Sequence, residues 1–192
     1  IGPNGAGKST LVNILSGSVT KTGGHVSILQ EKIEESHKVM VNFGIAPQEE
    51  ILWPESTSWQ HLLMFSRLKG LNEDEAKAHV ELVMKQLSLT DYRHFYPQQL
   101  STGIRKKLLI GISMLAGSKV MVLDEPCAGL DVPSREEVIR CLKKVLKDRK
   151  STILYTSQSM EEAGSIANRI GILFNGRLIE IGDNHSLVEE YG

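Results

Sequence analysis

The stretch from Gly2 to Ser9, GPNGAGKS, decides the fold. It fits the pattern G-x-x-x-x-G-K-[ST], in which small residues let successive backbone N–H groups wrap around phosphates at the start of a helix. Lys8 is expected to hold the β- and γ-phosphates of a nucleotide, and Ser9 to ligate Mg²⁺. The residues predicted to bind the nucleotide here are Gly2, Pro3, Asn4, Gly5, Ala6, Gly7, Lys8, Ser9 and Thr10.

Ile1 directly precedes this motif. A phosphate loop normally leaves the end of a β-strand, so we expect the chain to be a fragment whose first strand lies upstream. An aromatic residue that stacks on adenine is expected upstream as well. After the loop, Leu11, Ile14 and Leu15 have helical spacing, and Gly17 is placed to end a helix.

A second motif, KVMVLDEP from Lys119 to Pro126, is an apolar strand that ends in two carboxylates. Buried carboxylates need a metal ion or a proton as compensation. Beside a phosphate loop, Asp124 is expected to hold Mg²⁺ and Glu125 to polarise the attacking water. The alternatives are a chance glycine turn for the first motif and an acidic surface turn for the second.

The bulk composition indicates a globular chain. Its 192 residues are 41% hydrophobic and 23% charged, with a net charge of -1, which fits neither a disordered chain nor a basic nucleic-acid binder. The most apolar stretch, 108–117, is about half the roughly 20 residues that a membrane span needs. Cys127 and Cys141 form no CxxC pair, which fits a reducing cytosol.

The last third of the chain alternates apolar strands with amphipathic helices. We predict strands at 119–123, 152–156 and 170–174, with helices at 134–148 and 159–168. This alternation is typical of a parallel α/β fold.

The first two thirds predict the remaining architecture. Residues 22–30 and 39–46 read as short strands, and the pattern turns helical from Ser56. We therefore expect one domain over 1–192, a P-loop NTPase core with a mainly parallel sheet, an N-terminal antiparallel β portion and a helical subdomain inserted at 55–116. One helix of this insert shows an apolar stripe formed by Val80, Val83, Met84 and Leu87.

Local signals fix several boundaries. Ser134 with Glu137, and Ser159 with Glu162, each match a capping box in which two orphan backbone donors at a helix start are satisfied. The segment FNGRL at 174–178 places Asn-Gly between apolar runs, which predicts a hairpin turn with positive φ at both residues.

With these motifs in order, the chain resembles the ATP-binding cassette (ABC) family. Gln48 in IAPQEE is similar to the family's lid glutamine, LSTGIRKKL at Leu100–Leu108 to its signature motif, and AGLD at Ala128–Asp131 to the loop that crosses to a partner cassette. The resemblance covers the whole chain. The segments 106–126 and 159–192 most resemble subfamily A, the large lipid-handling transporters.

The resemblance implies ATP and Mg²⁺ as ligands. It implies that Gln48 senses Mg²⁺ and the γ-phosphate and takes part in catalysis with Glu125. It also implies that Ser101, Gly103 and Asp131 contact nucleotide across a head-to-tail pair of cassettes.

Two motifs depart from the family pattern. The usual LSGGQ reads LSTGI, so Thr102 places a branched side chain where glycine lets the backbone approach phosphate, and Ile104 replaces a polar residue. Gln158 stands where the family has its switch histidine. Glutamine can bridge phosphate and water but cannot hold a proton, so slow turnover is expected.

The signature segment carries Arg105, Lys106 and Lys107 near a predicted helix start, where cations oppose the helix dipole. We expect an incoming anion to relieve this, and the resemblance provides the γ-phosphate of the second cassette. A solvated basic helix face is the alternative. None of the six histidines lies in a motif.

The leading hypothesis is a cassette on the cytosolic face of a membrane that hydrolyses Mg-ATP to drive transport, of lipid by resemblance, without nucleic acid. Ile51, Leu52, Trp53 and Trp59 would receive the coupling helices of a transmembrane domain, or cover the core of the helical insert. The alternatives are a cassette that binds ATP structurally while its partner turns over, and a soluble non-transport ABC ATPase.

Overall fold

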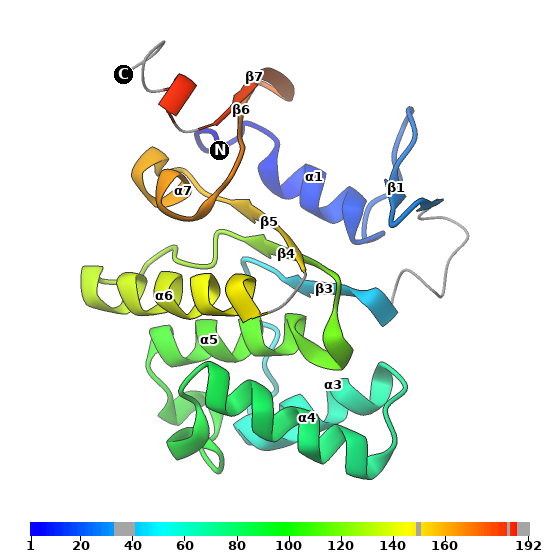
Figure 1. The fold of residues 1–192 in the computed structure, drawn as a ribbon, viewed down its shortest axis with the longest axis vertical. Coiled ribbons are helices and arrows are strands. Elements are labelled where there is room, and N and C mark those ends of the chain that lie inside the picture. The colour runs from blue at the N-terminus through cyan, green and yellow to red at the C-terminus, as the bar shows by residue number, and fades with distance from the viewer. Residues whose placement is uncertain (33–40, 149–150, 184, 188–192) are drawn as a thin grey trace.

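Three parallel strands form the centre of the fold (Figure 1). The sheet order is β3 (Phe43–Ala46), β4 (Val120–Asp124) and β5 (Thr152–Thr156), with β4 in the middle. The predicted α/β class with a parallel sheet is confirmed. The structure is a computed structural model that describes residues 1–32, 41–148, 151–183 and 185–187.

The side chains of β4 alternate between the two faces of the sheet, because successive strand residues point to opposite sides. Val122 packs with Val12 of helix α1 (Lys8–Leu15) on one face. Met121 and Leu123 join the main core cluster on the other face. Both faces are therefore covered, as parallel sheets generally are.

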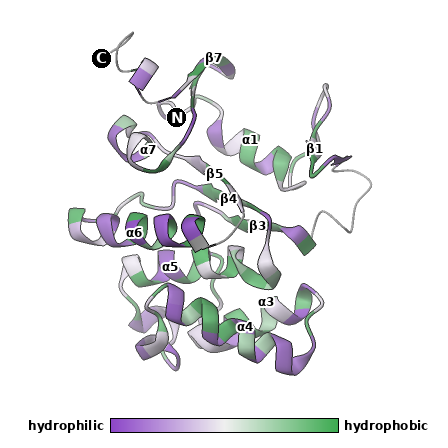
Figure 2. Ribbon diagram, in the orientation of Figure 1, coloured by the Kyte–Doolittle hydropathy of each residue, from purple (hydrophilic) through white to green (hydrophobic). Residues whose placement is uncertain are grey.

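The second face is covered by α5 (Thr102–Ser113) and α6 (Val132–Asp148), and α3 (Ser58–Leu68) and α4 (Glu73–Gln86) lie beyond α5 (Figure 1). Hydrophilic and hydrophobic bands alternate along α4 and α6 in Figure 2, as in amphipathic helices. The predicted apolar stripe is confirmed, since α4 buries it almost completely; its members are Val80, Val83, Met84 and Leu87.

Short 3-10 turns complete the helical layer, and one lysine ties this layer to the sheet. The turns are η2 (Thr90–Tyr92), η3 (Pro97–Gln99) and η4 (Leu115–Gly117). Lys69, at the end of α3, donates from Nζ to the carbonyls of Phe43 and Leu115 at 3.0 and 3.2 Å. Burial lowers the pKa of Lys69 to about 8.

The antiparallel portion before the sheet is shorter than predicted. Within the described residues 22–32, β1 (Ser27–Ile28) pairs with β2 (Glu31–Lys32), so the strand predicted at 22–30 is wrong over most of its length. Its glycine-rich first half offers few apolar side chains to bury. Of the strand predicted at 39–46, residues 43–46 form β3, and 39–40 lie outside the described residues.

The predicted capping box at Ser134 is wrong. Helix α6 begins two residues earlier, and Asp131 Oδ1 accepts the backbone N–H of Ser134 at 3.1 Å. Asp131 is therefore the capping residue, which suits a carboxylate at the positive end of a helix dipole. Glu137 is left to pair with Lys107, at 2.6 Å between Oε1 and Nζ.

Half of the capping box at Ser159 is confirmed. Helix α7 (Met160–Ile166) begins after Ser159, whose Oγ accepts the N–H of Glu162 at 3.2 Å. The reciprocal bond is absent from this part of the structure, because the Glu162 carboxylate turns away to Tyr155 and Ser157.

The last two strands, β6 (Ile170–Phe174) and β7 (Arg177–Gly182), form the predicted hairpin. The turn residues Asn175 and Gly176 have φ of 46° and 74°, which confirms the prediction of positive φ at both. Ile1 lies along β6: its amino group donates to the Gly171 carbonyl at 2.6 Å. Among the described residues, no helix is both long and apolar enough to cross a membrane.

Gly44 in β3 gives a direct test of how tightly the helical layer is fitted to the sheet. A Cβ at this position would lie 1.7 Å from the backbone oxygen of Ser113, at the end of α5. Because backbone cannot move aside as a side chain can, Gly44→Ala should lower the free energy of unfolding by about 1–3 kcal/mol. Urea unfolding measures this, with Gly23→Ala, where a Cβ meets open space, as the control.

Candidate functional site

The phosphate loop has a backbone that only glycine allows at three positions. A Cβ on Gly2 would lie 2.3 Å from the carbonyl oxygen of Leu173 in β6. Gly5 and Gly7 have φ of 76° and 102°, in the left-handed region that strains other residues. The glycines of the motif are therefore fixed by the close approach of β6 and by the shape of the loop.

The loop runs directly into α1, so Lys8, Ser9 and Thr10 form the first turn of a helix. The first N–H groups of any helix lack intrahelical acceptors, and they lie at the positive end of its dipole. The loop therefore ends in a helix start of the kind that can bind an anion.

Lys8 is almost completely buried and already has oxygen partners. Its Nζ donates to the carbonyls of Gly2 at 2.8 Å and Pro3 at 3.1 Å. It also lies 3.1 Å from Oε1 of Glu125, whose side chain is equally buried. The ammonium that is predicted to hold phosphate thus faces the carboxylate that is predicted to act on water.

Asp124 and Glu125 lie at the end of β4, beside the end of the neighbouring parallel strand β5. Asp124 at the end of β4 pairs in register with Thr156 at the end of β5. Thr156 Oγ1 donates to Asp124 Oδ1 at 2.5 Å and accepts the N–H of Glu125 at 2.9 Å. Glu125 has φ of 46°, an uncommon conformation that this bond helps to hold.

Gln158, two residues after the end of β5, reaches across to the same carboxylate. Its Nε2 lies 3.1 and 2.9 Å from the two oxygens of Glu125. An amide can donate to a carboxylate but cannot exchange a proton with it. Four of the predicted residues, Lys8, Asp124, Glu125 and Gln158, therefore meet in one place.

The oxygen atoms of Asp124 and Ser9 are suitable ligands for the Mg²⁺ of Mg-ATP. The described residues contain no group of three or more His, Cys, Asp or Glu that could hold a metal ion by itself. Mg²⁺ is commonly bound by one or two protein oxygens, with phosphates and water completing its shell. The buried carboxylate of Asp124 and the hydroxyl of Ser9 suit that pattern.

Gln48 lies after β3 with an exposed side chain, and its backbone is tied to the signature helix. Lys106 of α5 donates from Nζ to the Gln48 carbonyl at 2.9 Å. Arg105 Nε lies 2.7 Å from Glu50 Oε2. The segment with the predicted lid glutamine is thus anchored to α5.

The predicted signature residues form a second group, next to the start of α6. Ser101 caps α5 by accepting the N–H of Ile104 at 3.4 Å, and a Cβ on Gly103 would lie 3.4 Å from the side chain of Ser134. Because α1 and α5 lie on opposite faces of the sheet, this group is separate from the phosphate loop (Figure 1). Asp131, the cap of α6, belongs to it.

The interpretation of Arg105, Lys106 and Lys107 as cations that await an anion is wrong. Arg105 pairs with Glu50, Lys106 binds the Gln48 carbonyl, and Lys107 pairs with Glu137. Lys107 is fully buried in that pair. Sequence spacing could not reveal these partners, because each of them lies outside α5 on a distant part of the chain.

Thr102 is exposed, and its Oγ1 accepts a hydrogen bond from Arg105 Nη2 at 3.3 Å.

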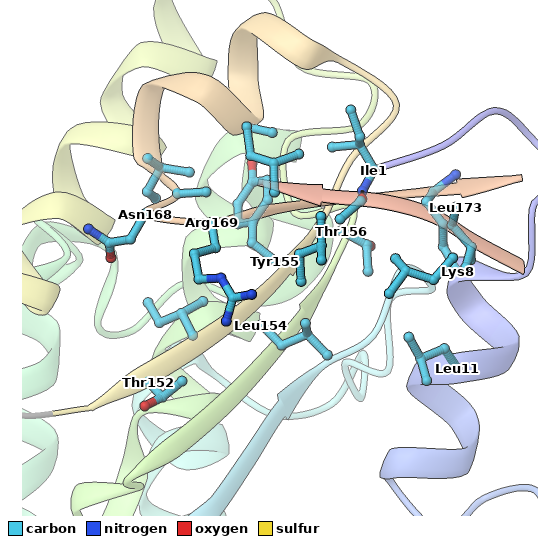
Figure 3. A pocket seen from close by; sticks show the side chains of 18 of the residues that line it. Ile1, Lys8, Leu11, Thr152, Leu154, Tyr155, Thr156, Asn168, Arg169 and Leu173 are labelled. Atoms are coloured by element: carbon cyan, nitrogen blue, oxygen red, sulfur yellow. Dashed lines mark hydrogen bonds between the residues drawn. The ribbon is translucent and has the colours of Figure 1, made fainter. Parts of the chain in front are cut away.

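A cavity of about 500 Å³ lies between β5 and β6, at one end of the phosphate loop (Figure 3). Its walls are mostly apolar, and its lining residues include Ile1, Lys8, Leu154, Tyr155, Thr156 and Leu173. Apolar walls suit packed protein better than the phosphates of a nucleotide, so we place the nucleotide at the loop and not in this cavity.

The sequence analysis did not single out Thr156, and it did not predict that Lys106 binds the segment of Gln48. Thr156 could have been found, because the carboxyl ends of adjacent parallel strands meet at one sheet edge and both strands were predicted. Lys106 lies 58 positions from its partner Gln48, and no sequence signal indicates that contact.

Comparison with known proteins gives one family. The family model described as ABC transporter matches residues 1–128. The mouse protein named phospholipid-transporting ATPase ABCA3 is 37% identical over 193 residues, and the human cholesterol transporter ABCA5 is 31% identical over 194. Each alignment covers all of this chain. The chain spans only 11% and 12% of those two relatives.

Solved structures agree with the fold. The cassette cbiO1 from Clostridium perfringens, part of an ABC transporter complex, has a TM-score of 0.88 at 25% identity, covering 99% of this chain and 78% of its own. The dimeric cassette MJ0796, described as bacterial, has a TM-score of 0.84 at 22% identity, covering 95% and 83%. A further structure of MJ0796 holds ADP and phosphate after hydrolysis.

Loss of the Lys8 ammonium should remove the main charged anchor for phosphate. We expect Lys8→Ala to abolish or greatly weaken ATP binding, because the loop itself is neutral and a charge-assisted bond is lost. Equilibrium binding of ATP to the full-length protein that contains this chain measures the effect. Lys85→Ala, which removes an exposed ammonium from α4, is the control. Unchanged affinity in Lys8→Ala would contradict the phosphate-loop assignment.

Proposed function

The chain belongs to the ABC transporter family, and we propose on that basis that it hydrolyses Mg-ATP to drive transport across a membrane. One observation carries the proposal: a phosphate loop, a lysine and two carboxylates converge at the ends of β4 and β5. This is the set of groups that phosphoryl transfer to water requires.

The proposed reaction begins with a change of partner at Lys8. ATP phosphate takes the place of Glu125 beside the ammonium, while the N–H groups at the start of α1 bind the phosphate chain. Ser9 and Asp124 hold the magnesium ion of Mg-ATP, as part of the substrate. Glu125, released from Lys8, then orients or deprotonates the attacking water.

Gln158 and Gln48 complete the proposed site. Gln158 already holds Glu125 through its amide nitrogen, which orients the carboxylate without accepting its proton. Gln48 would reach Mg²⁺ and the γ-phosphate from the segment that Lys106 anchors. Its exposed side chain leaves it able to approach from outside.

We propose that Ser101, Gly103 and Asp131 contact the nucleotide of a second cassette in a head-to-tail pair. Ser101 and Gly103 belong to the start of α5, which lies on the other face of the sheet from α1, and this position supports the proposal. The related cassette MJ0796 is dimeric.

Part of the predicted docking surface remains available for a transmembrane partner. Ile51 and Trp53 are each 45% exposed, whereas Leu52 and Trp59 pack against the core. The Trp53 ring stacks on His61, whose Nε2 accepts the backbone N–H of Trp53 at 2.8 Å. Burial lowers the pKa of His61, which favours the neutral ring that this bond needs. We therefore propose docking at Ile51 and Trp53 alone.

The wider assignments follow from the relatives. Names such as phospholipid-transporting ATPase and cholesterol transporter support lipid as the transported substrate. We propose the cytosolic face of a membrane as the location. We also propose that residues 1–192 form a single domain with a helical subdomain at 55–116. Ile1 pairs with β6 in the parallel sense, through its bonds to Gly171 and Leu173.

A cassette that binds ATP without efficient turnover is the second candidate. The amide of Gln158 supports it, since this side chain contacts Glu125 where the family has a histidine. Single-turnover hydrolysis at this site separates the two functions.

Glu125→Gln should separate binding from chemistry. The neutral amide cannot deprotonate water, so we expect the hydrolysis rate to fall sharply while ATP affinity is kept or increased, because Lys8 loses a competing anion. ATP binding and single-turnover hydrolysis in the full-length protein measure both. If this variant lost ATP binding as severely as Asp124→Ala, the two roles would be assigned wrongly.

Gln158→His should speed hydrolysis at this site. Loss of one contact to developing charge typically costs about 2.7–4 kcal/mol, roughly a hundred- to a thousandfold in rate, and glutamine recovers only part of it. Single-turnover hydrolysis with the second cassette's glutamate disabled is the measurement. Equal rates for the parent and Gln158→His would show that this position does not limit turnover, and would direct attention to Thr102.

A further inference from the structure

Glu162 of α7 connects two loops that border the proposed site. One carboxylate oxygen, Oε1, accepts the hydroxyl of Tyr155. The other, Oε2, accepts the hydroxyl of Ser157 at 3.0 Å. A carboxylate has acceptor sites on both oxygens, so a single side chain satisfies both donors.

The first branch leads toward the loop that follows Glu125. The Tyr155 hydroxyl lies 3.3 Å from Sγ of Cys127, which is buried two residues after Glu125. Burial raises the pKa of Tyr155 and raises that of Cys127 to about 11, so both groups stay protonated at neutral pH. The thiol can therefore donate to Tyr155, which donates in turn to Glu162.

The second branch leads to the residue beside Gln158. Ser157 is 3% exposed, and its Oγ also accepts the N–H of Ser159 at 3.0 Å. Its carbonyl accepts the N–H of Gly2, the first residue of the phosphate loop, at 3.3 Å. Ser157, which directly precedes Gln158, is thus held by Glu162 through its hydroxyl and by the phosphate loop through its carbonyl.

We propose that Glu162 is a positioning residue for hydrolysis, which through Ser157 holds Gln158 against Glu125 and through Tyr155 holds the loop that begins at Cys127. The proposal rests on the proposed ATPase function of the same site. The Glu162 carboxylate accepts hydrogen bonds from Tyr155 and Ser157, and the proposed effect on the site passes through these partners.

A purely structural role for Glu162 would give a different experimental result. Carboxylates in the first turn of a helix stabilise it through the dipole, and Glu161 occupies the same turn of α7. Glu161 is exposed and carries the same charge, so Glu161→Gln removes the dipole contribution without touching Ser157 or Tyr155. It is the matched control for Glu162→Gln.

The test compares Glu162→Gln, Glu162→Ala, Ser157→Ala and Glu161→Gln in the full-length protein, with the second cassette's glutamate disabled. Glutamine keeps the shape of Glu162 but replaces one acceptor with a donor, whereas alanine removes both acceptors. We expect single-turnover hydrolysis to fall roughly 10-fold in Glu162→Gln and up to about 100-fold in Glu162→Ala, because small misplacements of catalytic groups are costly. ATP affinity should stay within about twofold of the parent value, since the phosphate loop is unchanged.

Ser157→Ala should reproduce most of the rate loss, and Glu161→Gln should hydrolyse ATP at the parent rate. If Glu162→Gln and Glu161→Gln lowered thermal stability alike and left the hydrolysis rate unchanged, the positioning role would be overturned. An equal loss of affinity and rate in Glu162→Gln would also overturn it. Glu125→Gln in the same assay tests the ATPase function separately: full hydrolysis in that variant would sink the proposed function.

Discussion

The buried ion pair between Lys8 and Glu125 holds the two halves of the site together, at 3.1 Å. Taking two charges out of water is costly unless they are paired and hydrogen-bonded, and here two carbonyls bind Lys8 while Gln158 binds Glu125. The phosphate loop, the end of β4 and the segment after β5 therefore depend on one set of charge-assisted bonds. A phosphate anion can give Lys8 the same compensation, so the arrangement favours an exchange of anionic partners.

The parallel sheet is what brings this pair together. The register of Asp124 with Thr156 places the ends of β4 and β5 side by side, and the threonine hydroxyl then serves one carboxylate and the backbone of the next residue. Glu125 adopts φ of 46° directly after the strand. Strain of this kind persists only where the surroundings hold it, and the bond from Glu125 to Thr156 does so here.

Local patterns in the sequence predicted the phosphate loop, the strand before Asp124, the apolar stripe of α4 and the turn at Asn175, because each depends on nearby residues alone. The start of α6 differs from the prediction because Asp131, in the predicted loop, caps the helix in place of Ser134, and both residue types are good helix caps. The partners of Arg105, Lys106 and Lys107 were also missed. They come from elements 30 to 58 positions away, and no periodicity encodes such contacts.

Arg105, Lys106 and Lys107 connect α5 to other parts of the fold, which residue spacing alone did not predict. Lys107 is fully buried against Glu137, and separating such a pair would leave a buried charge without compensation, so α5 and α6 are held to each other. Lys106 and Arg105 bind the segment around Gln48 from the same helix. Gln48 also follows β3 by only two residues, so its backbone is held between the sheet and α5. The packing of α5 against β3 therefore helps to set where the segment around Gln48 lies.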